Sequence, residues 1–307
     1  MASPEFHRLV DRMRARRSTG VQTIEQLRAG MEEAGRKFAP PRGVTFTPAD
    51  ADGVPGEWAD PPAADPETVI FYLHGGGYGV GSIASHRHLV AKLAVAAKAR
   101  AFAIDYRLAP EHRFPAAVED AVAAARWLMR QGVRPEKLVI AGDSAGGGLA
   151  IATCLVLRDA GGPLPAALVC MSPLTDLAKE GRSMRTKIDL DPMVQPDSSA
   201  AYAARYVGAD GDLKAPLASP LYADLRGLPP TSILVGTWET LLDDSTRFAA
   251  RAEAAGVDVD LQVWDEMIHI WPYFADIIPE GREAIARIAD YIGSRTTQAR
   301  STPDNRG

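Results

Sequence analysis

Short apolar runs alternate with longer amphipathic stretches along most of the chain. Continuous apolar runs of this length are typical of strands buried on both faces, and amphipathic stretches are typical of helices packed on a sheet. The predicted strands cover residues 44–47, 69–73, 101–105, 138–141, 167–171, 232–235 and 259–264, and the predicted helices cover 85–97, 115–130, 145–159, 243–255 and 281–294. This strand-then-helix order predicts an α/β fold with a mainly parallel, doubly wound sheet.

Two regions depart from that rhythm. Amphipathic stretches at residues 4–16 and 23–34 precede the first strand and predict a small helical appendage. Between Leu174 and Pro230 no strand pattern occurs, and residues 191–206 have helical character. We therefore expect this second region to be an insertion over the strand tips.

Composition excludes several classes of protein. The chain has 307 residues, of which 46% are hydrophobic, so it can bury a large core. Its net charge of −5 gives no general attraction for nucleic acid. The basic residues within positions 12–17 predict a solvated helix face. No signal-peptide stretch and no apolar span of bilayer length occur, so we expect a cytoplasmic protein without membrane insertion.

The two cysteines, Cys154 and Cys170, lie in a predicted helix and a predicted strand. They form no Cys-x-x-Cys motif and no cluster with histidine. We therefore expect reduced core residues, with neither a disulfide nor a metal site.

A nucleophile is indicated by the pentapeptide from Gly142 to Gly146, with Ser144 at its centre, directly after the apolar run 138–141. A Gly-x-Ser-x-Gly motif between a strand and a helix makes a turn so sharp that the serine is exposed at the strand tip. A serine hydroxyl becomes a good nucleophile only when a neighbouring base accepts its proton.

His269 is the best candidate for that base among six histidines, because it alone follows the last predicted strand. Parallel strands end at one edge of the sheet, so this loop should emerge beside Ser144. The alternative is a histidine that only satisfies a hydrogen bond in the core.

The acid that orients the histidine should follow the strand 232–235. Glu239 is nearest to the strand tip, whereas Asp243 and Asp244 are placed to cap the next helix. Glu239 is therefore favoured, with Asp243 as the alternative acid.

An oxyanion hole is indicated by Gly75, Gly76 and Gly77, which follow the strand 69–73. Backbone N–H groups of such a run can approach a developing negative charge, and the N–H of Ala145 would complete the hole. The alternative is a phosphate or dinucleotide cradle. It fits poorly, because no Gly-Lys-Ser/Thr occurs and a Gly-x-Gly-x-x-Ala window starts only at Gly79, six positions past Leu73.

Four motifs together carry a family resemblance: residues 74–78, 105–111, 142–147 and 268–269. They resemble the hormone-sensitive-lipase-like carboxylesterases of microbes. The resemblance implies an α/β-hydrolase core, a helical cap, and activity on short acyl esters without a metal or organic cofactor. The family's acid lies in an Asp-Pro-Leu-x-Asp stretch, and here Glu239 replaces the first Asp. The block 105–111 is interpreted as structural, bracing the oxyanion loop.

The expected organisation follows from this resemblance. Residues 1–40 would form an N-terminal helical cap segment, 41–180 and 215–295 the α/β-hydrolase core, 181–214 a cap insertion, and 296–307 a polar tail. The candidates for lining the pocket are Met13, Met31, Met193, Trp238 and Trp271. The alternative for each is simple packing, which is the commoner role of buried Met and Trp side chains.

The sequence therefore predicts a serine carboxylesterase acting on a small-molecule ester. Hydrolysis of a lactone or of an acetylated amine would use the same triad. A non-catalytic small-molecule receptor is a third alternative, but receptors resembling this family lack the catalytic histidine. The strand 259–264 could also pair across a homodimer.

Overall fold

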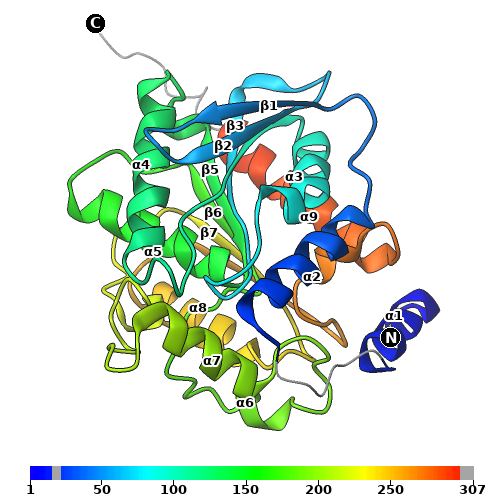
Figure 1. Ribbon diagram of the computed structural model, residues 1–307. Coiled ribbons are helices and arrows are strands. Elements are labelled where there is room, and N and C mark those ends of the chain that lie inside the picture. The colour runs from blue at the N-terminus through cyan, green and yellow to red at the C-terminus, as the bar shows by residue number, and fades with distance from the viewer. Residues whose placement is uncertain (16–21, 298–307) are drawn as a thin grey trace, which may run out of the picture.

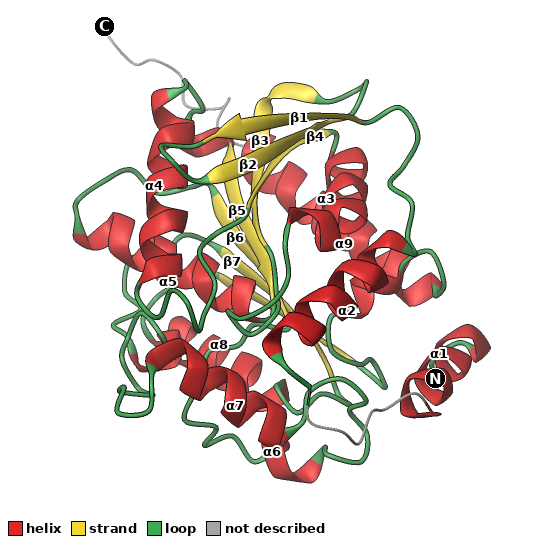
Figure 2. Cartoon of the chain, in the orientation of Figure 1, coloured by secondary structure: helices red, strands yellow, loops and turns green. Residues whose placement is uncertain are grey.

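The computed structural model describes residues 1–15 and 22–297. These residues form one eight-stranded sheet in the order β1-β2-β4-β3-β5-β6-β7-β8 (Figures 1 and 2). Its strands are β1 (Thr45–Asp50), β2 (Pro55–Asp60), β3 (Asp65–Leu73), β4 (Ala99–Ile104), β5 (Leu138–Asp143), β6 (Ala167–Met171), β7 (Thr231–Gly236) and β8 (Val259–Trp264). The strands from β4 to β8 in that order run parallel, so the α/β fold class is confirmed.

The helices lie on both faces of the sheet and beyond the carboxyl ends of its strands. They are α1 (Pro4–Ala15), α2 (Ile24–Arg36), α3 (Ile83–Ala97), α4 (Ala116–Arg130), α5 (Ala145–Asp159), α6 (Ser183–Thr186), α7 (Pro196–Val207), α8 (Leu242–Ala254) and α9 (Pro279–Thr297), with short 3₁₀ turns at Pro135–Lys137, Pro220–Tyr222 and Trp271–Phe274. In Figure 1, α4 and α5 lie on one side of the sheet and α3 and α9 on the other, while α6 and α7 lie below it.

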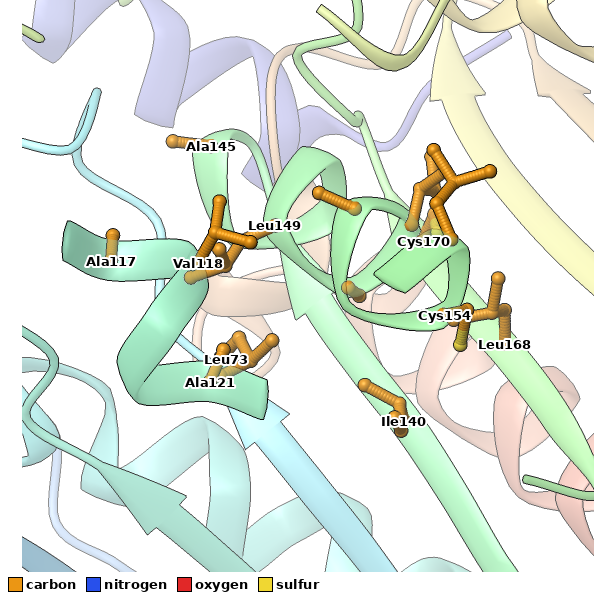
Figure 3. Close-up of a cluster of buried hydrophobic side chains, with 14 of the residues drawn as sticks. Leu73, Ala117, Val118, Ala121, Ile140, Ala145, Leu149, Cys154, Leu168 and Cys170 are labelled. Carbon is orange, nitrogen blue, oxygen red and sulfur yellow. The ribbon is translucent and has the colours of Figure 1, made fainter. Parts of the chain in front are cut away.

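The apolar strand residues alternate between two cores, one on each face. Leu138 and Ile140 of β5 belong to the core under α4, α5 and α8, whereas Val139 and Ala141 belong to the core under α3 and α9. This period of two explains why the strands appear in the sequence as unbroken apolar runs. Figure 3 shows part of the first core, between α5 and the strands beneath it.

Both cysteines lie in that first core. Cys154 on α5 and Cys170 on β6 are unpaired and completely buried, as predicted. Burial raises the pKa of the Cys170 thiol to about 12. Both residues therefore act as small apolar side chains that pack the helix onto the strand (Figure 3).

Strand β2 is absent from the sequence prediction. Its residues Pro55–Asp60 alternate small, acidic and aromatic side chains and contain no apolar run. It forms a hairpin with β1 and pairs antiparallel with β4, and its two buried residues, Gly56 and Ala59, lie on opposite faces of the strand. The strand is therefore specified by its neighbours more than by its own composition.

Two predicted boundaries need correction. The insertion helix expected over 191–206 begins only at Pro196, because Pro192 and Pro196 interrupt the helical pattern and proline is favoured at the first helical position. The first two residues expected in the polar tail also differ, because Thr296 and Thr297 belong to α9 and Thr296 is buried. Residues 298–307 lie outside the described residues, as do Arg16 and Arg17 of the basic cluster.

Strand β8 lies at one edge of the sheet, as the homodimer hypothesis requires. Its residues are partly exposed along the whole strand, apart from the exposed Val263. Pairing across β8 stays a prediction.

Helix α2 docks onto α3 through a glycine. A Cβ on Gly35 would lie 2.6 Å from the Cα of Ser85, so the two backbones meet where no side chain fits. Gly30, in the same helix, is exposed and has no atom within 4 Å of a Cβ position. The two glycines therefore offer a matched test of this contact.

We expect Gly35→Ala to destabilise the protein by about 1–3 kcal/mol, because the added methyl group overpacks a backbone contact. Gly30→Ala should instead stabilise it by up to about 1 kcal/mol, because alanine is the better helix former. Thermal unfolding of both variants beside the wild type measures the difference. Equal shifts for the two variants would contradict close docking of α2 on α3.

Candidate active site

Ser144 lies at the turn between β5 and α5 with φ 52° and ψ −121°, a conformation that is strained for a residue with a side chain. The flanking glycines make the turn possible. A Cβ on Gly142 would lie 2.4 Å from the carbonyl carbon of Gly146, and one on Gly146 would lie 2.0 Å from the Leu73 oxygen. The Ser144 N–H donates to the Met171 carbonyl at 2.8 Å, which anchors the turn to β6. The serine is thereby held at the strand tip.

His269 and Glu239 form a buried pair at the same edge of the sheet. His269 Nδ1 lies 3.0 Å from Glu239 Oε2, and both side chains are almost completely buried. The other carboxylate oxygen accepts hydrogen bonds from Ser172 Oγ at 2.8 Å and from the Gly236 N–H at 2.6 Å. With Nδ1–H donating to Glu239, Nε2 of the imidazole is left to act as a base.

The charge of Glu239 governs the basicity of the histidine. Burial alone lowers the pKa of His269, but the hydrogen bond and charge of Glu239 outweigh it and raise this pKa above its usual value. Asp191 and Asp143 add smaller contributions in the same direction. The imidazole is accordingly a stronger base than an exposed histidine.

Asp243, the alternative acid, has other partners. Its Oδ2 accepts from the Ser183 N–H at 3.1 Å, and its own N–H donates to Ser183 Oγ at 3.0 Å. Asp244 accepts from the N–H groups of Thr175 and Asp176, and burial raises its pKa to about 8. The structure thus brings Glu239 to the histidine and places both aspartates at the start of α8.

Ser144 and His269 line one cavity of about 150 Å³. In the described part of the chain no hydrogen bond joins the two side chains. Such bonds often tighten only when substrate is present. The remaining wall is mostly apolar and comes from α2, the end of β5, the insertion and the loops after β3, β6, β7 and β8: Met31, Gly76, Gly77, Val80, Asp143, Leu174, Met193, Val194, Ser198, Ser199, Tyr202, Leu241 and Ile270.

The glycine loop contributes two of its three glycines to this cavity. Gly76 and Gly77 line it, with φ values of 120° and 61° that favour glycine. The hydrogen bonds of the described residues leave their N–H groups without an acceptor. The N–H of Ala145 is also free to point outward, because it lies in the first turn of α5.

Gly75 has a different role from the one expected. Its N–H donates to Asp143 Oδ1 at 3.0 Å, so it is not available to an oxyanion. A Cβ at this position would lie 2.2 Å from Asp143 Oδ2. Gly75 therefore anchors the glycine loop to the carboxylate of Asp143.

Asp143 contacts the glycine loop, and the sequence analysis did not single it out although it lies beside the serine. It is fully buried and also accepts a hydrogen bond from the Tyr72 hydroxyl at 2.6 Å. Nearby, the Tyr106 hydroxyl donates to the His74 carbonyl at 2.7 Å, which fits the bracing role expected for the block 105–111. The loop that carries Gly76 and Gly77 is thus supported by side chains from three strand ends.

The expected pocket residues divide into two groups. Met31 and Met193 line the cavity with Ser144, and Met13 lines a larger neighbouring cavity of about 740 Å³. Trp271 is instead buried against Trp264, and Trp238 packs on Phe6. These two tryptophans therefore have the packing role that the sequence analysis gave as the alternative.

The described residues contain no group of three or more His, Cys, Asp and Glu side chains arranged to hold a metal ion. None of the described helices is long and apolar enough to cross a membrane.

Residues 70–273 match the family described as the alpha/beta hydrolase fold, and the chain belongs to that family. It is 42% identical over 299 residues to an acetyl-hydrolase of Streptomyces hygroscopicus, covering 96% of this chain and 98% of the other. A solved esterase of the bacterial hormone-sensitive lipase family is 46% identical with a TM-score of 0.93, over 96% of this chain and 99% of that one. An esterase crystal soaked by p-nitrophenyl butyrate has 42% identity, a TM-score of 0.93 and coverage of 96% and 100%. Within the α/β hydrolases the chain is thus a carboxylic ester hydrolase of the hormone-sensitive-lipase-like group.

The close contacts of Gly76 generate a test of the glycine loop. A Cβ on Gly76 would lie 2.2 Å from the Val80 oxygen, so Gly76→Ala must displace the loop and its N–H groups. We expect kcat on p-nitrophenyl acetate to fall about 10²- to 10³-fold, as when an oxyanion donor is lost.

Gly53→Ala is the matched control. Gly53 also has a positive φ, 87°, but it lies in the β1–β2 turn with open space around it. The Gly53→Ala variant should lose stability through backbone strain while keeping its kcat per folded molecule. A similar loss of kcat in both variants would contradict a specific role for the loop.

Proposed function

We propose that this enzyme hydrolyses short-chain acyl esters with Ser144 as nucleophile, His269 as general base and Glu239 as the acid that orients the histidine. The observation that carries the proposal is the 3.0 Å contact between His269 Nδ1 and Glu239 Oε2, beside the cavity that Ser144 also lines. A buried carboxylate in this position selects the tautomer whose Nε2 can accept the serine proton.

The N–H groups of Gly76, Gly77 and Ala145 form the oxyanion hole in this proposal. Their backbone positions support it, because they border the cavity or the serine and have no other acceptor among the described residues. The N-terminus of α5 adds a favourable dipole for negative charge at the same place.

The reaction follows from these positions. Ser144 Oγ attacks the ester carbonyl carbon while its proton passes to His269 Nε2, and the carbonyl oxygen becomes an oxyanion held by the backbone N–H groups. As the carbon–oxygen bond to the alcohol breaks, His269 returns the proton to the leaving oxygen. Water then attacks the acyl-enzyme by the same steps, which releases the carboxylic acid and regenerates the serine.

The helical segments 1–40 and 181–214 form the cap over this site in our proposal. Met31 of α2 and Met193, Ser198 and Tyr202 of the insertion supply cavity wall that the core does not. The two segments also contact each other, because Arg14 donates to the carbonyl groups of Asp189 and Leu190.

A short acyl group suits the size of the cavity. A volume of about 150 Å³ is comparable to an engineered apolar cavity that holds benzene. An acetyl or butyryl group fits such a space, whereas a long chain would have to displace Met31, Met193 or Ile270, which also border the larger neighbouring cavity. The related esterase crystal soaked by p-nitrophenyl butyrate supports the choice of a short ester.

Hydrolysis of an acetyl group from an amine is a second candidate. It is favoured by the similarity to the acetyl-hydrolase of Streptomyces hygroscopicus, whose name does not specify the group that carries the acetyl. A receptor function is disfavoured, because a receptor has no need of a buried carboxylate behind an imidazole.

A rate series tests the substrate class. We expect kcat/KM on p-nitrophenyl esters to be largest for acetate or butyrate and to fall for octanoate and palmitate. A lactone and an acetylated arylamine, assayed beside them, should react more slowly. A maximum at palmitate would refute the short-acyl proposal, and a faster acetylated arylamine would favour the second candidate.

Ser144→Ala is the control for this series. It should lower kcat by about 10⁶-fold, since the nucleophile is lost, while the circular dichroism spectrum is unchanged. Substantial turnover by this variant would rule out the proposed nucleophile.

The choice of acid gives a separate prediction. Glu239→Gln should lower kcat by about 10⁴-fold, because the amide can donate to Nδ1 and so favours the wrong tautomer. Asp243→Asn should leave kcat nearly unchanged, because Asp243 contacts Ser183 and not the histidine. Steady-state kinetics on p-nitrophenyl acetate separates the two, and the reverse pattern would make Asp243 the acid.

A further inference from the structure

A second buried carboxylate lies close to the catalytic pair. Asp191, in the insertion between α6 and α7, is only 1% exposed. Within the described residues no lysine, arginine or histidine forms an ion pair with it, so hydrogen-bond donors alone must stabilise its charge. A buried charge without a cation is costly unless its oxygens are fully occupied.

The two oxygens of Asp191 face different parts of the protein. Oδ1 accepts from the N–H groups of Met193 at 2.8 Å and Val194 at 3.0 Å, within its own turn. Oδ2 accepts from the N–H of Thr240 at 2.9 Å and from its hydroxyl at 3.1 Å. The first set is an ordinary local turn, whereas the second reaches across 49 residues to the loop after β7.

The hydrogen bonds of Asp191 thus bridge the insertion and the loop after β7, and both of these segments belong to the candidate active site. Met193 and Val194 line the cavity that contains Ser144 and His269. Thr240 directly follows Glu239, whose carboxylate holds the imidazole. One carboxylate therefore joins a wall of the substrate cavity to the loop of the catalytic acid.

Asp191 also acts on His269 through its negative charge. The acidic groups that face His269 are Glu239 after β7, Asp143 at the end of β5 and Asp191 in the insertion, and each raises the pKa of His269. Removal of the Asp191 charge should therefore make the imidazole a weaker base and lower its pKa.

We propose that Asp191 is a positioning residue that fixes the cap insertion against the loop of Glu239, so that the cavity wall and the Glu239–His269 pair keep one relative position. This inference rests on the proposed esterase function. A residue that only stabilised the turn at Met193 would need one of its oxygens, not both.

Asp191→Asn tests the proposal, because the amide has the same shape but can accept at only one end and carries no charge. We expect kcat on p-nitrophenyl acetate to fall about 10- to 100-fold per folded molecule, as for a small displacement of catalytic groups. The acid limb of the pH profile of kcat/KM should also move to lower pH, because a His269 with a lower pKa stays neutral in more acidic solution.

Two further variants separate the effect of the hydrogen bond to Thr240 from the effect of the Asp191 charge and from a general loss of stability. Thr240→Val loses the hydroxyl bond but keeps the Asp191 charge, so it should lower kcat less and leave the acid limb in place. Asp243→Asn also removes a carboxylate that ties the insertion to the start of α8, but it touches neither Thr240 nor the histidine. Asp243→Asn should change neither kcat nor the acid limb of the pH profile.

The outcomes distinguish this inference from the function on which it rests. If Asp191→Asn lowers only the melting temperature, with kcat and the acid limb unchanged, Asp191 is structural and the inference is wrong. If Asp191→Asn does not fold, an unchanged kcat in Thr240→Val overturns the inference equally. Wild type and Ser144→Ala are assayed in parallel, so equal turnover by those two would instead refute the esterase proposal.

Discussion

The structure depends on one steric constraint, the close approach of the start of α5 to the end of β3. The Leu73 oxygen occupies the space that a side chain on residue 146 would need, and Gly146 occupies the space that a side chain on residue 142 would need. The chain can therefore reverse direction within a few residues and hold Ser144 at a positive φ. Because β3 and β5 are neighbours in the parallel sheet, the same approach brings the glycine loop after β3 beside the serine.

Buried carboxylates hold the loops that this edge of the sheet brings together. Loops have no ladder of backbone hydrogen bonds, so their N–H groups need other acceptors. Asp143 takes the N–H of Gly75, Glu239 takes that of Gly236, and Asp191 takes that of Thr240. In each case a carboxylate fixes a loop that contains or supports a residue of the proposed active site. The charges that tune His269 are thus the same groups that shape the site.

The sequence predicted the parts of this arrangement that depend on local pattern or on order along the chain. Seven strands, Ser144 and the position of His269 follow from apolar runs, one pentapeptide and the rule that parallel strands end at one edge. Strand β2, the anchoring role of Gly75 and the packing of Trp238 and Trp271 depend on tertiary neighbours, so spacing alone could not reveal them. Asp143 lay within the recognised motif, but only its contacts indicate what it does.

Glu239 stands at the position where the resemblance of the sequence implies an aspartate, and its contacts hold the longer side chain in place. A glutamate is one methylene longer than an aspartate and has one more rotatable bond, so it would lose more freedom when it orients a histidine. Here the longer side chain turns back on its own loop, and its Oε1 accepts from the Gly236 N–H and the Ser172 hydroxyl. Ser172 in turn accepts from the N–H of Ile270, the residue after His269. The acid and the histidine are therefore tied together twice, once directly and once through Ser172, which restrains the additional bond of the glutamate.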